Sequence, residues 1–164
     1  MPRTLVRTLR TRRDTRQLGA DIAAKLVSGD LVILSGDLGA GKTFLARTIL
    51  RGLGVDARIT SPTFALVHEY DAAAGTSVLH ADLYRLRDTA EPPDRARALA
   101  TLEAEVARLG LRERRAEGAV VLVEWAEDAA GFLGGDPAFV VSLQTGADGA
   151  RTATLSGQRA GGIV

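Results

Sequence analysis

The stretch Gly36-Asp37-Leu38-Gly39-Ala40-Gly41-Lys42-Thr43 decides the fold of this 164-residue chain. It satisfies the pattern G-x-x-x-x-G-K-[ST], whose fixed positions rarely coincide by chance. The apolar run Leu31-Val32-Ile33-Leu34 leads into it and, being short and bounded by turn residues, predicts a strand buried on both faces. After the motif, a helix with one apolar side is predicted as far as Gly52. A strand, a glycine-rich turn and a helix in this order are typical of a phosphate-binding P-loop.

The residues of this motif have distinct expected roles. The glycines let successive backbone N–H groups converge on phosphate oxygens, and the start of the helix adds its positive dipole. Lys42 is expected to bridge the terminal phosphates, and the Thr43 hydroxyl to ligate Mg²⁺. The chain uses arginine for nearly all its basic residues, and its only lysines are Lys25 and Lys42. One of the two therefore stands at the motif position where a compact ammonium suits phosphate oxygens. The predicted nucleotide-binding residues of the motif are Leu38, Gly39, Ala40, Gly41, Lys42 and Thr43.

Two carboxylates follow predicted strands and are candidates for the catalytic chemistry. Glu124 comes directly after the apolar run Val120 to Val123 and is the first choice for a magnesium ligand, or for the acid that orients a metal-bound water. Asp82 ends the run Val78 to Ala81 and could share the metal or position the attacking water. The sequence leaves these two roles open. His80, which alternates with apolar residues, is interpreted as filling the sheet face.

The rest of the chain predicts one α/β domain. Asp14 is expected to cap a helix, and Asp94 to Gly110 is expected to form another. Further strands are expected at the following ranges: a strand end at Ile59 to Thr63, a hairpin of Phe64 to Tyr70 with Ser77 to Ala81, and a hairpin of Val140 to Leu143 with Thr152 to Leu155. The expected fold is a P-loop NTPase three-layer sandwich with a mixed sheet, parallel at its centre and with antiparallel edge hairpins. The domain is expected to span residues 1–156, with residues 157–164 as a frayed tail.

Composition excludes several classes of chemistry. No cysteine occurs, which excludes disulfides, thiolate nucleophiles and cysteine-based metal sites. The formal net charge of +1 gives no whole-protein field that would recruit DNA or a membrane surface. An arginine-rich start without an apolar stretch, and no membrane-length apolar run, predict a cytoplasmic protein.

Several segments together resemble the bacterial TsaE (YjeE) family. They are the P-loop, Ser61-Pro62-Thr63-Phe64, His80-Ala81-Asp82-Leu83-Tyr84-Arg85-Leu86 and Val123-Glu124-Trp125, in this order. The resemblance implies a Mg²⁺-dependent ATPase needed for the threonylcarbamoyladenosine modification of tRNA. In that family ATP hydrolysis supports a complex of TsaB and TsaD, so that tRNA is met indirectly, through the complex.

The resemblance also implies roles by motif position. Thr43 and Glu124 would hold Mg²⁺, Asp82 would assist hydrolysis, and the Ser61 to Phe64 loop, with Thr63, would act as a nucleotide switch. The segment around Thr11 would pass close to the adenine. The chain departs from the family pattern in a longer segment between Leu86 and Leu109, in Ala126 and in Phe44.

Two other functions fit the same motif. A small-molecule kinase would need an arginine-rich lid, for which Asp94 to Arg115 is the only candidate segment. A nucleotide-gated binding module would use ATP to order the Ser61 to Phe64 loop without catalysis. ATP is favoured over GTP, because the chain has no guanine-reading Asn/Thr-Lys-x-Asp segment. Slow turnover is expected in the absence of partners, since no arginine finger is evident.

Overall fold

A computed structural model describes residues 3–87 and 95–163 of the chain. The strands are β1 (Leu5–Leu9), β2 (Leu31–Gly36), β3 (Val67–Asp71), β4 (Ser77–Asp82), β5 (Val120–Glu124), β6 (Phe139–Thr145) and β7 (Arg151–Ser156). The α-helices are α1 (Arg12–Ala23), α2 (Lys42–Gly52), α3 (Tyr84–Arg87), α4 (Arg95–Arg108) and α5 (Leu111–Ala116). Short 3₁₀ turns lie at Ala73–Gly75, Gly131–Leu133 and Ala160–Gly162.

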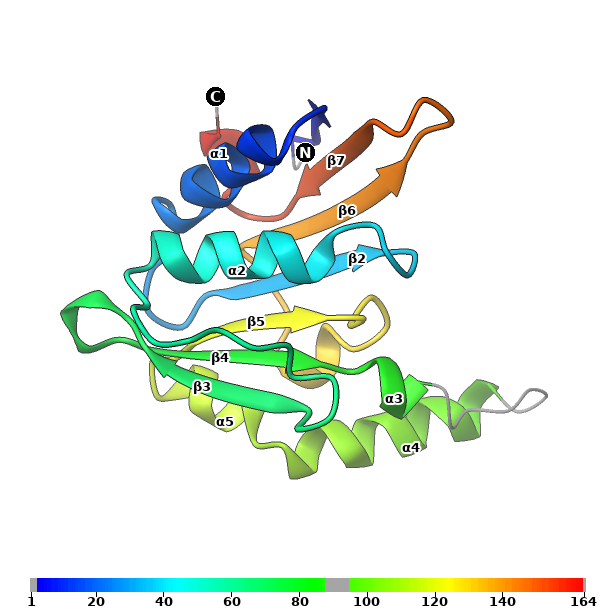
Figure 1. Cartoon of the computed structure of the whole chain (residues 1–164). Helices are drawn as coiled ribbons and strands as arrows, with labels where there is room; N and C mark the ends of the chain where they lie inside the picture. The colour runs from blue at the N-terminus through cyan, green and yellow to red at the C-terminus, as the bar shows by residue number, and fades with distance from the viewer. Residues whose placement is uncertain (1–2, 88–94, 164) are drawn as a thin grey trace.

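The strands form a single sheet in the order β1-β7-β6-β2-β5-β4-β3 (Figure 1). β2 lies between β6 and β5 and is parallel to both, and β4 is parallel to β5. The β3–β4, β6–β7 and β1–β7 pairs are antiparallel. The predicted mixed sheet with a parallel centre and antiparallel edges is therefore confirmed.

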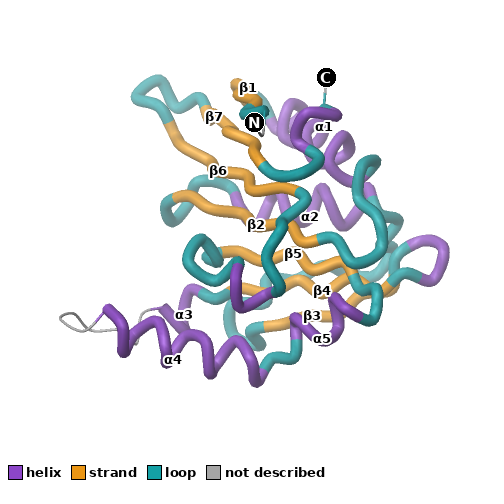
Figure 2. The backbone as a smooth tube through the Cα atoms, turned by 180° about the vertical axis from the view of Figure 1, so that it is seen from behind, coloured by secondary structure: helices purple, strands orange, loops and turns teal. Residues whose placement is uncertain are grey.

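Both faces of the sheet are buried, as the apolar run of β2 predicted. Val32 and Leu34 point into a core cluster shared with α1 and α2, whereas Leu31 and Ile33 point into a second cluster shared with α4 and α5. Figures 1 and 2 show these two helix pairs on opposite faces of the sheet. The result is the three-layer sandwich, and it brings the carboxyl ends of β2, β4 and β5 to one edge.

The structure corrects several predicted boundaries. Thr11, not Asp14, is the N-cap of α1: its hydroxyl accepts from the Asp14 N–H, while the Asp14 carboxylate accepts from the Thr11 N–H. Ile59 to Thr63 forms no strand, and β3 begins only at Val67, because Leu66 adopts a left-handed φ of 67° that an extended strand does not allow. The predicted helix from Asp94 is observed as α4 (Arg95–Arg108), and Asp94 itself lies outside the described residues.

The segment from Gly157 is packed rather than frayed in its described part. Ala160 and Ile163 are buried in the α1–α2 core cluster. Arg159 donates to both carboxylate oxygens of Asp30, at 2.7 and 3.2 Å. The glycine-rich composition suggested fraying, but two apolar side chains and one ion pair hold this segment on the domain.

Candidate functional site

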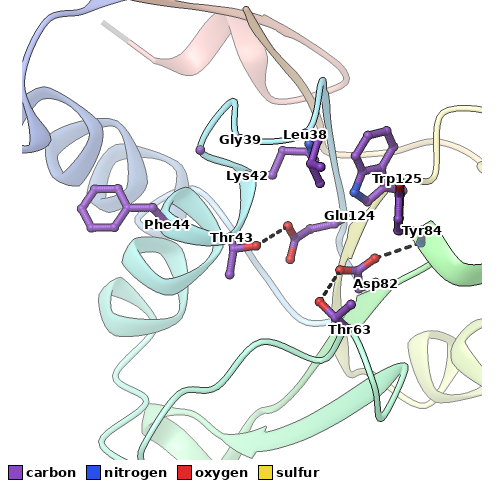
Figure 3. A pocket seen from close by; sticks show the side chains of 11 residues that line it. Leu38, Gly39, Lys42, Thr43, Phe44, Thr63, Asp82, Tyr84, Glu124 and Trp125 are labelled. Carbon is purple, nitrogen blue, oxygen red and sulfur yellow. Dashed lines mark hydrogen bonds between the residues drawn. The ribbon is translucent and has the colours of Figure 1, made fainter. Parts of the chain in front are cut away.

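A cavity of about 310 Å³ opens at the carboxyl edge of the sheet, beside the P-loop (Figure 3). Its walls come from the P-loop and α2, from the ends of β4 and β5, and from the loop before β3. The lining residues are Leu38, Gly39, Gly41, Lys42, Thr43, Phe44, Thr63, Asp82, Tyr84, Glu124 and Trp125. Three distant segments of the sequence thus meet where β2, β5 and β4 end.

Two glycines of the P-loop are required by its geometry. Gly36 has a φ of 133°, and an added Cβ would lie 2.4 Å from the Leu143 carbonyl oxygen. Gly41, the N-cap of α2, has a φ of 104°. Both values belong to the left-handed region that side chains disfavour. The loop can therefore turn sharply enough to aim its N–H groups at one point in front of the helix.

Lys42 is folded onto its own loop. Its Nζ donates to the carbonyl oxygens of Gly36 at 2.6 Å and Asp37 at 2.8 Å, and it lies 4.0 Å from the ring centroid of Trp125. Burial lowers the pKa of the Lys42 ammonium, and the nearby carboxylate of Glu124 opposes this effect. Burial disfavours the charged form of Lys42. The negative charge of a phosphate beside this ammonium would stabilise that form.

Glu124 links the P-loop to β4. Its Oε1 accepts from the Thr43 hydroxyl at 2.8 Å, and its Oε2 lies 2.8 Å from His80 Nε2. Glu124 is 1% exposed and His80 is fully buried. A buried carboxylate needs such partners, since without them its desolvation is costly. The two contacts hold the Glu124 carboxylate facing the first turn of α2.

Asp82 is held from both sides. Its Oδ2 accepts from the Thr63 hydroxyl at 3.1 Å, and its Oδ1 accepts from the Tyr84 backbone N–H at 2.9 Å. β4 and β5 are parallel with Asp82 opposite Glu124, so the two carboxylates end neighbouring strands. Figure 3 shows the Thr43 hydroxyl directed at Glu124, and Thr63 and Tyr84 on either side of Asp82.

The loop that carries Thr63 brings two hydroxyls together and exposes an aromatic ring. Ser61 Oγ lies 2.8 Å from Thr63 Oγ1. The ring of Phe64 is 86% exposed, and the Arg85 guanidinium lies 5.5 Å from its centroid. Thr63 is the residue of this loop that lines the cavity, and the loop also meets β4 where the Asp82 backbone N–H donates to the Leu66 carbonyl oxygen at 3.0 Å.

The structure brings together most of the residues that the sequence singled out. Leu38, Gly39, Gly41, Lys42, Thr43, Thr63, Asp82 and Glu124 all line the cavity. Ala40 is buried behind the P-loop and does not line it. Thr11 is also absent from the lining, and its hydroxyl caps α1; the adenine contact that its position in the family implies stays a prediction.

Sequence reasoning missed several residues of the site, among them His80 and Tyr84. His80 was interpreted as filler, yet it contacts Glu124 from the fully buried part of β4. Its spacing of two from Asp82 was the available signal, since residues two apart on a strand share a face. Tyr84 lines the cavity and packs on Trp125 with ring centroids 4.9 Å apart. No pattern in the sequence indicated that the rings of Tyr84 and Trp125 pack against each other.

The oxygen ligands of the site suit magnesium bound with a nucleotide. Among residues 3–87 and 95–163 there is no group of three or more His, Asp or Glu side chains that could hold a metal by themselves. Mg²⁺ in phosphate sites usually takes one or two protein oxygens and completes its shell with phosphate and water. The hydroxyl–carboxylate pair of Thr43 and Glu124, in front of an anion-binding helix start, fits that requirement.

Comparison with known proteins points to one family. The family model for "Threonylcarbamoyl adenosine biosynthesis protein TsaE" matches residues 9–153. A curated TsaE of Mycobacterium bovis is 41% identical over 119 residues, which is 71% of this chain and 66% of that protein. A curated TsaE of Haemophilus influenzae is 40% identical over 103 residues, covering 63% of this chain and 56% of that protein. The matches thus span less than two thirds of the length of these relatives.

A solved structure has the same overall fold. The crystal structure of YdiB from Bacillus subtilis superposes with a TM-score of 0.67 at 26% identity, over 96% of this chain and 87% of that one.

No helix in the part of the chain that the structure describes is long and apolar enough to cross a membrane.

Proposed function

The chain belongs to the TsaE family of threonylcarbamoyl adenosine biosynthesis proteins, and on this premise we propose that it is a Mg²⁺-dependent ATPase. Its hydrolysis of ATP serves the threonylcarbamoyladenosine modification of tRNA in the cytoplasm, in support of TsaB and TsaD, which carry out the transfer. The observation that carries the proposal is the meeting of Lys42, the Thr43–Glu124 pair and Asp82 in one cavity at the start of α2.

Each of these residues has a defined task in the proposal. The P-loop N–H groups and Lys42 bind the phosphates, and Lys42 exchanges its contacts with the Gly36 and Asp37 carbonyls for phosphate oxygens. Thr43 and Glu124 hold Mg²⁺, which when bound neutralises charge on the phosphate oxygens. Asp82, whose carboxylate is fixed by Thr63 and Tyr84, orients the attacking water.

The same geometry supports slow turnover by the isolated chain. No arginine is among the described residues that line the cavity, and Lys42 is the one cationic side chain in that lining. An arginine placed at the transferred phosphoryl group commonly accelerates hydrolysis by a factor on the order of a thousand or more. Assembly with TsaB and TsaD, by moving the Ser61 to Phe64 loop or adding a charge, is the proposed source of activation.

The kinase alternative gains no support from the fold. Its candidate lid, within Asp94 to Arg115, is observed as α4 and α5 in its described part, and these helices pack with the second core cluster. None of their described residues lines the cavity.

The test is ATP hydrolysis by the purified chain, alone and mixed with TsaB and TsaD. We expect Mg²⁺-dependent phosphate release that increases in the mixture and is lost in Lys42→Ala and Thr43→Ala. Unchanged turnover in both variants would contradict the proposal. Phosphate appearing on a metabolite would instead favour a kinase, and nucleotide-dependent binding without hydrolysis would favour a gated binding module.

A further inference from the structure

Arg151, at the start of β7, lies against the P-loop although it is far from it in sequence. Its register partners are Thr145 on β6 and Leu9 on β1. A Cβ added to Gly41 would lie 3.4 Å from the Arg151 Nε, 3.6 Å from its Cδ and 3.8 Å from its Cζ. The guanidinium therefore lies against the backbone of Gly41, the N-cap residue directly before α2.

This guanidinium lacks a partner within the described residues. Its Nε is shielded from solvent and makes no hydrogen bond. Five other arginines that are half-buried each bond a carboxylate or carbonyl oxygen: Arg7, Arg87, Arg114, Arg115 and Arg159. Arg151 is thus the exception among the half-buried arginines of residues 3–87 and 95–163.

An unpaired, partly buried guanidinium is costly unless a ligand completes it. A buried donor without an acceptor loses its bonds to water and gains nothing in return, and the loss is larger for a charged group. The neighbouring residue Gly41 is the N-cap of α2, and backbone N–H groups at the start of a helix are donors suited to an anion. Arginine donates two parallel bonds to phosphate oxygens more readily than any other side chain. An anion held by the P-loop would satisfy the donors of Arg151 at the same time.

We propose that Arg151 is a phosphate-binding residue of the nucleotide site, and that it donates to the phosphate chain from the β6–β7 side of the P-loop. The proposal rests on the proposed binding of a nucleoside triphosphate at Gly36 to Thr43. In it Lys42 and Arg151 provide positive charge from two sides of the loop: Lys42 beside Trp125, which follows β5, and Arg151 beside Gly41, from the start of β7.

The test is calorimetric titration of the folded chain with Mg-ATP and, separately, with inorganic tripolyphosphate and Mg²⁺. Arg151→Gln is expected to weaken the binding of both ligands on the order of ten-fold or more, and Arg151→Lys to weaken it less. The matched control is Arg47→Gln, an exposed arginine on α2 outside the nucleotide cavity, which should bind both ligands as the unaltered chain does.

A structural role would give a different result. Because the Arg151 Nε has no hydrogen-bond partner among the described residues, Arg151→Gln should keep the melting temperature of the unaltered chain while its affinity falls. Unfolding or strongly lowered melting of Arg151→Gln would overturn the proposal.

The remaining outcomes separate this proposal from the ATPase proposal. Equal Mg-ATP affinity in Arg151→Gln and the unaltered chain would overturn the role of Arg151 and leave the ATPase proposal standing. Weaker binding of Mg-ATP alone, with tripolyphosphate unaffected, would place the guanidinium at the base or ribose and overturn the phosphate contact. Failure of the unaltered chain to bind either ligand would overturn both proposals.

Discussion

Glu124 is the residue whose surroundings define the site most closely. It is almost fully buried, yet one carboxylate oxygen meets the Thr43 hydroxyl and the other meets His80. A carboxylate kept in the core only for packing would be costly, and an apolar side chain would serve better there. Its position at the end of a strand whose other residues are all valine or leucine supports the functional role proposed for it.

Replacing Glu124 by glutamine should separate binding from hydrolysis. The glutamine amide is nearly isosteric with the carboxylate and keeps polar contacts with Thr43 and His80, but it carries no negative charge for Mg²⁺. We expect Glu124→Gln to retain ATP binding and to lose Mg²⁺-dependent hydrolysis on the order of a hundred-fold, measured as phosphate release against Mg²⁺ concentration. Glu127→Gln, at a neighbouring position that pairs with Arg87, is the control. Normal magnesium dependence in Glu124→Gln would move the metal role to Asp82.

At this scale the sequence predicted the identities of the site residues better than their contacts. The P-loop is evident from its sequence pattern, and the strand-end positions of Asp82 and Glu124 follow from the runs of residues that precede them. The spacing of two puts His80 on the same strand face as Asp82, but its contact with Glu124 could not be predicted, because the register that sets the two side by side depends on which strands become neighbours. Arg151 was missed for the same reason, since only the β6–β7 and β1–β7 pairings carry it to the P-loop.

Helix α1 shows how one short motif can be given two interpretations. Family position placed Thr11 near adenine, whereas the structure uses its hydroxyl in a capping box with Asp14. The backbone N–H groups of Arg10 and Thr11 both donate to the Asp14 carboxylate, at 2.9 and 2.8 Å. These hydrogen bonds hold the pKa of Asp14 below its ordinary value.

Thr11→Ala distinguishes the two roles of this helix start. Loss of the cap should lower the free energy of unfolding by about 1 kcal/mol, measured by denaturant unfolding, while Mg-ATP affinity stays unchanged. Weaker ATP binding with unaltered stability would support the adenine contact instead.

The capping box also predicts a direction for the effect of pH. The folded pKa of Asp14 is lowered, so its contribution to stability is present above the ordinary carboxyl pKa and is lost as pH falls through the folded pKa. The stability difference between Asp14→Asn and the unaltered chain should therefore shrink on acidification below about pH 4. A difference that is independent of pH would contradict this account of the helix start.

Other elements escaped the sequence for identifiable reasons. Strand β1 is an edge strand in which half-buried and exposed residues alternate over only five positions, with Leu9 alone buried, and its arginine and threonine residues obscured that pattern. Helices α3 and α5 span four and six residues, too few for a helical period to repeat clearly. The central strands β2 and β5 were predicted correctly, because a strand that is buried on both faces has an unbroken run of apolar residues.

At the scale of the whole molecule, the C-terminal segment holds the sheet and the α1–α2 layer together. Ile163 and Ala160 lie in the same core cluster as Leu18 and Phe139. Arg159 ties this segment to Asp30, at the entrance to β2. The edge of the sheet that carries Arg151 is therefore supported from both ends of the chain.

Shortening one side chain of this segment should measurably weaken the fold. Ile163 is 7% exposed, and Ile163→Ala is expected to lower the free energy of unfolding by about 2 kcal/mol through lost burial and a residual cavity. Gln158→Ala, at an exposed position of the same segment, is the control and should change stability little. Equal stability of Ile163→Ala and the unaltered chain would restore the interpretation of a frayed tail.

The central claim concerns the whole assembly of strand, glycine turn and helix: it binds a triphosphate through backbone N–H groups, Lys42 and Thr43. The most direct measurement is calorimetric titration of Mg-ATP into the folded chain and into Lys42→Ala, with circular dichroism to verify that both are folded. The account predicts saturable heat for the unaltered chain and its loss in Lys42→Ala. The absence of heat in the unaltered chain, or the same affinity in both, would contradict it.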